Sequence, residues 1–131
     1  LRRRSVAERN GLTVVAVAKS SQDPVLHTLA PTIQTSTGVP QPTLLVLPAA
    51  VGIDTKALDF GTGVSTNVSD GSVDELIEQL PSADSVVLAT RAGKSDLRDV
   101  YELARTVSSM GGKNVCVVLL ARGSAYREAL D

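Results

Sequence analysis

The turn Ala92-Gly93-Lys94-Ser95 combines residue types that can bind an anion. A glycine and a lysine between a strand and a helix resemble the end of a phosphate-binding loop, where backbone N–H groups and the lysine hold phosphate. A complete loop also needs a glycine five positions before the Gly-Lys pair, and that position holds Leu88. Gly93, Lys94 and Ser95 are therefore candidates for a single-anion site only. The alternative is that Ser95 caps a helix and Lys94 is a solvated charge.

The other reactive side chains are scattered along the chain. The only histidine, His27, is expected on a helix beside Leu26, which is typical of a surface or structural histidine. The only cysteine, Cys116, lies among valines and is predicted to be a buried thiol. Asp54 and Asp59 could serve as acid or base at a sheet edge, although an acidic residue at the start of a short helix favours interaction of Asp54 with the helix dipole. No metal-ligand spacing occurs, so we predict no catalytic residue, no metal site and no cofactor.

Composition predicts a single globular domain. The 131 residues are 43% hydrophobic and 21% charged, with a net charge of −1. The few aromatic residues and the balanced charge argue against nucleic-acid binding, which needs stacking platforms and many cations. The lone cysteine and the absence of a signal peptide or a run of about 20 apolar residues favour an intracellular chain.

Three arginines, Arg2, Arg3 and Arg4, stand at the start of the sequence. They would suit the cytoplasmic end of a preceding membrane helix and could contact an anionic membrane surface. The alternative is a solvated basic end. We predict a basic juxtamembrane-like segment over residues 1–10 and one α/β domain over residues 11–131, located at the cytoplasmic face of the plasma membrane.

Continuous apolar runs rich in β-branched residues predict buried strands. These runs are 12–18, 43–47, 85–90 and 114–120. The stretch from Gly61 to Gly71 is either a loop or holds a short strand at 64–68. Because helices are expected between the strands, we predict a three-layer α/β sandwich with a mainly parallel sheet of four to five strands, Rossmann-like or P-loop-kinase-like.

Capping residues mark the expected helices. The expected features are a helix opened by Asp23-Pro24 and kinked or ended early by Pro31, a short helix over about 54–60, a capping box of Ser72 and Glu75, and a helix capped by Ser95 and ended by Gly111-Gly112. The last of these is strongly amphipathic. Its predicted buried face is Leu97, Val100, Tyr101, Leu103, Ala104, Val107 and Met110, opposite Arg98, Asp99, Glu102 and Arg105.

Three passages of the chain resemble a known family. They are GLTVVAVAKSSQDP, DPVLHTLAPTIQTSTGVPQPTLLVLPAAVGIDTKAL and ADSVVLATRAGKSDLRDVYELARTVSSMGGKNVCVVLL. The stretch from Gly11 to Ala121 resembles the cytoplasmic domain of bacterial polysaccharide co-polymerases, the chain-length determinant proteins, and of the associated bacterial tyrosine kinases. The third passage is the most specific, since it is similar to the family's late strand, Arg-x-Gly-Lys-Ser/Thr turn, helix and final strand.

The kinase motifs of that family are altered in this sequence. Where the kinases have a glycine-rich loop ending in Gly-Lys-Ser/Thr, this chain has residues 50–55, with Asp54 in place of a cation. The interval between Phe60 and Ser82 is too short for the family's two aspartate-bearing segments. The arginines of its oligomerisation helix would fall at Leu26 and Leu29. The resemblance therefore implies a degenerate kinase-like domain that has lost its P-loop.

These features favour a non-catalytic cytoplasmic domain of a membrane-associated regulator of polysaccharide chain length or export. Such a domain would act through protein–protein contacts or self-association. The alternative is a small Rossmann-like enzyme or an anion- or nucleotide-binding domain that uses the sheet edge near residues 48–53 and 91–95. A third possibility is a structural spacer.

Overall fold

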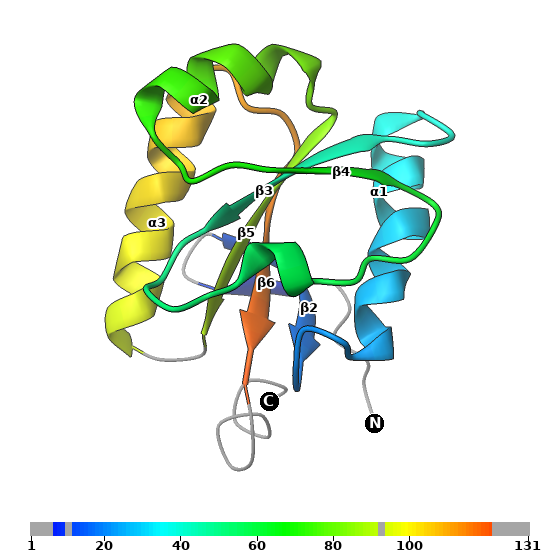
Figure 1. Ribbon diagram of the computed structural model, residues 1–131, viewed down its shortest axis with the longest axis horizontal. Coiled ribbons are helices and arrows are strands. Elements are labelled where there is room, and N and C mark those ends of the chain that lie inside the picture. Colours follow the sequence, from blue (N-terminus) through cyan, green and yellow to red (C-terminus); the bar gives the residue numbers. More distant parts are fainter. Residues whose placement is uncertain (1–6, 10–11, 92–93, 122–131) are drawn as a thin grey trace.

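The structure is a computed structural model that describes residues 7–9, 12–91 and 94–121. Within these residues a single sheet has the strand order β1-β2-β6-β5-β3-β4 (Figure 1). The strands are β1 (Ala7–Arg9), β2 (Leu12–Ala18), β3 (Thr43–Pro48), β4 (Ser65–Val68), β5 (Ser85–Arg91) and β6 (Val115–Leu120). Strands β2 to β6 are mutually parallel, whereas β1 pairs antiparallel with β2. The predicted α/β sandwich with a mainly parallel sheet is confirmed.

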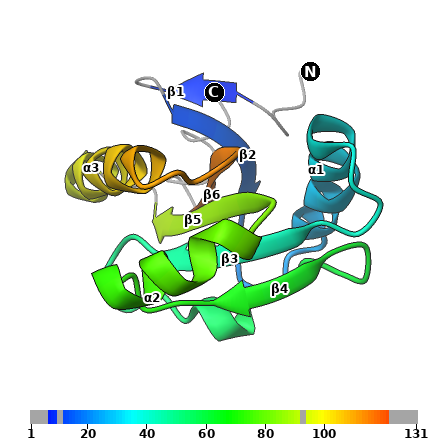
Figure 2. The same ribbon diagram turned by 90° about the horizontal axis from the view of Figure 1, so that it is seen from above.

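Helices cover both faces of the sheet, which gives three layers (Figure 2). One face carries the 3₁₀ segment η1 (Pro24–Thr28) and helix α1 (Leu29–Thr37). The other face carries α2 (Val73–Gln79), η3 (Leu80–Ser82) and α3 (Lys94–Ser109). Two buried clusters fill the space between the layers. The α3-side cluster includes Leu45, Leu47, Leu76, Leu88, Val100 and Val107, and the α1-side cluster includes Leu26, Leu29, Ile33, Leu44, Val46 and Phe60.

The four predicted strands are observed, each within one residue of its expected bounds. Of the two alternatives for the stretch from Gly61 to Gly71, the short strand is the one observed, as β4. Strand β1 lies in the segment 1–10, where no strand was predicted. Its sequence, Ala-Glu-Arg, has no apolar pattern, and the strand forms because it pairs with β2.

The first helix begins as predicted but is divided in two. The Asp23 carboxylate accepts a hydrogen bond from the Val25 N–H at 3.0 Å, which caps η1. Pro31 was expected to kink or end the helix, yet it is the third residue of α1. The N–H groups of a first turn have no intrahelical partner, so proline costs little there.

The capping box is half confirmed. The Ser72 hydroxyl accepts from the Glu75 N–H at 3.4 Å. Glu75 does not reach back to Ser72, because its carboxylate instead accepts from the Asp70 N–H at 3.1 Å. The Ser72 N–H donates to the Asp70 carboxylate at 2.8 Å, and this bond lowers the pKa of Asp70.

Three expectations about the remaining helices were wrong in detail. The helix expected over 54–60 is only the 3₁₀ turn η2 (Thr55–Ala57), because the chain becomes extended at Leu58 and buries Phe60. Helix α3 begins at Lys94, so Ser95 lies inside the helix rather than at its cap. Tyr101, placed on the buried face, is 44% exposed.

Candidate functional site

The fold creates a topological switch point between β3 and β5. These strands are adjacent and parallel, and the chain leaves them toward opposite faces. After β3 it passes through η2 and contributes Phe60 to the α1-side cluster, whereas after β5 it enters α3. In open α/β sheets, ligands bind outside the carboxyl ends of strands at such a point. This edge is therefore the first candidate site.

The loop after β3 lies close to the end of β5. Gly52 has φ of +85°, and a Cβ there would lie 3.3 Å from Nη1 of Arg91. The neighbouring Val51 is 90% exposed. The Asp54 carboxylate accepts from the Lys56 N–H at 3.1 Å and so caps the 3₁₀ turn η2. Asp54 places a negative charge in the corner, and this charge would repel a triphosphate.

Thr90 supplies a polar group at this edge that was not predicted from the sequence. Its side chain is fully buried, and among the described residues its hydroxyl is the one buried side-chain oxygen or nitrogen without a hydrogen-bond partner. Strand alternation places it on the face of Val86 and Leu88, which pack in the α3-side cluster. The available signal was a threonine near the end of an otherwise apolar strand.

Replacement of Thr90 by valine is expected to raise the free energy of unfolding by about 1 kcal/mol, because an unsatisfied buried hydroxyl is exchanged for a methyl group. Ser85→Ala is the matched control. Ser85 is also fully buried, but its hydroxyl donates to the Asn114 carbonyl at 2.7 Å, so its loss should lower stability by a similar amount. Urea denaturation measures both changes. A destabilised Thr90→Val would show that this hydroxyl has a partner in solution.

The predicted anion-site residues are placed only in part. Gly93 lies outside the described residues. Lys94 and Ser95 form the start of α3, but the structure does not describe the positions of their side chains. Their role therefore stays a prediction, as does that of Arg2, Arg3 and Arg4.

His27 and Asp59 form a pair that was not predicted. Their Nε2 and Oδ2 atoms are 3.4 Å apart, and both side chains are about half exposed, which confirms His27 as a surface histidine. The Gly61 N–H donates to the Asp59 carboxylate at 3.0 Å, and this bond, followed by that from His27, lowers the pKa of Asp59. The described residues contain no group of three or more acidic, histidine or cysteine side chains that could hold a metal ion.

Cys116 is buried in β6, as predicted, and burial raises the pKa of its thiol to about 12. A thiol with this pKa stays protonated at neutral pH and is a poor nucleophile. It lines a cavity of about 250 Å³ between α1 and the amino ends of β5 and β6. The other lining residues are Val15, Thr32, Ile33, Ser36, Ser85, Asn114 and Val115.

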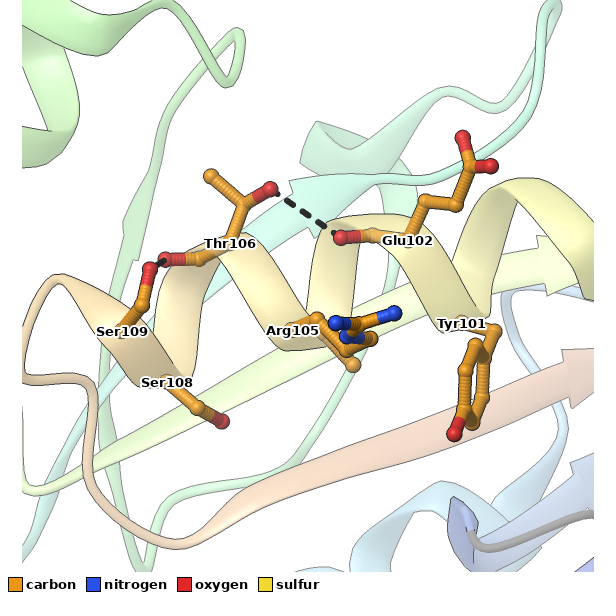
Figure 3. Close-up of a pocket in the computed structure, with 7 residues that line it drawn as sticks. Tyr101, Glu102, Arg105, Thr106, Ser108 and Ser109 are labelled. Carbon is orange, nitrogen blue, oxygen red and sulfur yellow. Dashed lines mark hydrogen bonds between the residues drawn. The ribbon is translucent and has the colours of Figure 1, made fainter.

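The exposed side of α3 is the second candidate site. An open cavity of about 820 Å³ follows this helix and is lined by Tyr101, Glu102, Ala104, Arg105, Thr106, Ser108 and Ser109 (Figure 3). Arg98, Tyr101, Arg105 and Ser108 recur at helical spacing, so they share one side of α3. Figure 3 shows Tyr101 and Ser108 on the side away from Glu102 and Thr106, with Arg105 between the two groups. We call these four residues the α3 stripe.

The α3 stripe is accessible and positively charged. Arg98 and Arg105 are exposed, and within the described part of the chain neither forms a salt bridge. Tyr101 between them is 44% exposed. By contrast, the hydroxyls of Thr106 and Ser109 donate to carbonyls of the same helix, at 3.1 and 2.8 Å.

Comparisons of the chain with protein-family models, with curated proteins and with solved structures found no match. The geometry thus defines the class of protein as a three-layer α/β sandwich, and the resemblance to polysaccharide co-polymerases stays a prediction. None of the described helices is long and apolar enough to span a membrane.

Proposed function

We propose that this chain is a non-catalytic cytoplasmic domain of a membrane-associated regulator of polysaccharide chain length or export. It acts by binding an acidic surface of another protein through the α3 stripe. The polysaccharide role is supported by the three passages between Gly11 and Leu120 that resemble the co-polymerase family. Association with the plasma membrane is supported by the basic residues Arg2, Arg3 and Arg4.

The observation that carries the proposal is the composition and position of the α3 stripe. Tyrosine and arginine are enriched among the residues that dominate binding energy at protein interfaces. Tyr101 lies between Arg98 and Arg105 on a helix of 16 residues whose other side is anchored by the fully buried Val100 and Val107. Because these buried residues fix the backbone of the helix against the core, little backbone entropy should be lost when a partner binds.

A complementation experiment tests this function. The full-length gene, with and without the codons for residues 12–121, is expressed in the source organism after deletion of the native copy. We expect both forms to reach the membrane and only the complete form to restore the size distribution of the exported polysaccharide. An unchanged size distribution without the domain would refute the proposal.

A second candidate function, binding of a small anion at the β3/β5 switch point, is favoured by the buried and unpartnered hydroxyl of Thr90. Thermal denaturation separates the two candidates, since a ligand that binds only the native state raises Tm. Under the first candidate, ATP with Mg²⁺ leaves Tm unchanged. Under the second, phosphate or a nucleotide raises Tm, and Lys94→Ala removes the increase.

A further inference from the structure

We infer that the free edge of β4 binds an extended basic segment of a partner protein, which adds to the sheet as another strand. Among the described residues, strand β4 (Ser65–Val68) is the last strand on its side of the sheet, and both views show it along the outside of the domain (Figures 1 and 2). Ser65, Thr66 and Asn67 are exposed. The strand contains neither charge nor proline, the residues that commonly protect an edge from pairing.

The direction of the backbone N–H groups determines which of them can bind an added strand at this edge. The Ser65 N–H donates inward to the Pro42 carbonyl at 2.9 Å, and the Ser69 N–H donates inward to the Val46 carbonyl at 3.1 Å. Backbone groups alternate along a strand, so the N–H groups of Thr66 and Val68 point outward. An added strand can accept hydrogen bonds from these two groups.

Charge around the edge selects a basic partner. Between Lys56 and Arg91 the sequence contains no lysine or arginine. It does contain six acidic residues, which are Asp59, Asp70, Asp74, Glu75, Glu78 and Asp84. Asp70, Asp74 and Glu78, on the turn and helix that follow β4, are exposed. Pairing of β4 with β4 of a second copy would bring these like charges together, which disfavours self-association through this edge.

The register between β3 and β4 indicates which side chains an added strand should carry on each of its two faces. Val68 is in register with Val46 and packs against the α1-side cluster, so it places an apolar side chain on the α1 face of the edge, beside the exposed Thr66. Asn67 is in register with Leu45 and lies exposed on the opposite face, the side of the sheet on which α2 packs. A matching segment therefore alternates β-branched residues with lysine or arginine.

This edge would be a second protein contact of the regulator proposed above, separate from the α3 stripe, and in cells the inference rests on that function. Binding by the purified chain is measured without polysaccharide, so failure of the two proposals can be distinguished. The probes are synthetic peptides of alternating lysine and valine, with alternating glutamate and valine as the matched control. Amide hydrogen exchange and NMR titration of the 131-residue chain report the contact residue by residue.

In the free chain we expect faster exchange at Thr66 and Val68 than at Ser65, Asn67 and Ser69. The lysine peptide should slow exchange at Thr66 and Val68, whereas the glutamate peptide should not. Equal effects of the two peptides, or shifts confined to other strands, would overturn the inference.

Thr66→Pro removes one outward N–H while leaving the inward bonds to β3 in place. We expect it to weaken the lysine peptide about tenfold, the upper range for one backbone hydrogen bond, whereas Thr66→Ala binds normally. The amide spectrum of each variant reports whether it is folded. If Thr66→Pro does not fold, a Lys/Val peptide with alternate amides N-methylated provides the same test, since it cannot pair with β4. Unchanged affinity in the folded variant, or for the methylated peptide, would contradict the proposed pairing.

Discussion

The double variant Arg98→Glu/Arg105→Glu is expected to lose its protein partner. Reversal of both charges turns attraction into repulsion on the two sides of Tyr101, and we expect affinity to fall at least about 100-fold, as for central interface residues. Both side chains are exposed and form no salt bridge with a described residue, so Tm should stay within about 2 °C of the unaltered chain. Co-purification with the export machinery from membranes measures the loss.

The control for this experiment lies on the same helix. Asp99→Lys/Glu102→Lys alters the same number of exposed charges, and Glu102 points away from Tyr101 and Ser108 (Figure 3). We expect this variant to retain the partner and the normal polysaccharide size distribution. Equal losses from the two double variants would show that the net charge of the surface, rather than the α3 stripe, determines binding.

Replacement of Leu88 by alanine is expected to lower the free energy of unfolding by about 3 kcal/mol, which combines lost burial with the cost of a cavity. Leu88 is fully buried in β5, between β3 and β6, and belongs to the α3-side cluster. Val51→Ala is the control, because Val51 is 90% exposed and should change stability by less than about 0.5 kcal/mol. Denaturation in urea measures both. Similar values for the two variants would mean that β5 is not at the centre of the core.

Strands, helix ends and the burial of Cys116 could be predicted because each depends on neighbouring residues in the sequence. The run LTVVAVA at residues 12–18 is apolar on both faces, which is typical of a strand covered on both sides, and β2 has these bounds. Asp23, Ser72 and Gly111 occupy helix ends because each satisfies a local backbone requirement; Gly111, for example, has φ of +96°. Cys116 was correctly predicted to be buried because its neighbours are valines.

Features that depend on distant contacts were not predictable in this way. The exposure of Tyr101 depends on how α3 rests on the sheet, and a tyrosine suits either face of a helix. His27 meets Asp59 across 32 residues of sequence, and no spacing rule reports such a pair. Thr90 was overlooked because a missing hydrogen bond is visible only once every neighbour is in place.

Site-specific photo-crosslinking in cells tests the central claim most directly. A benzophenone amino acid is placed at Tyr101 in the α3 stripe or at Ile77, an exposed apolar residue of α2. We expect a crosslink from position 101 to a segment rich in aspartate and glutamate, and we expect it to disappear when the charges of Arg98 and Arg105 are reversed. No adduct at position 101, or an adduct that survives the reversal, would contradict it.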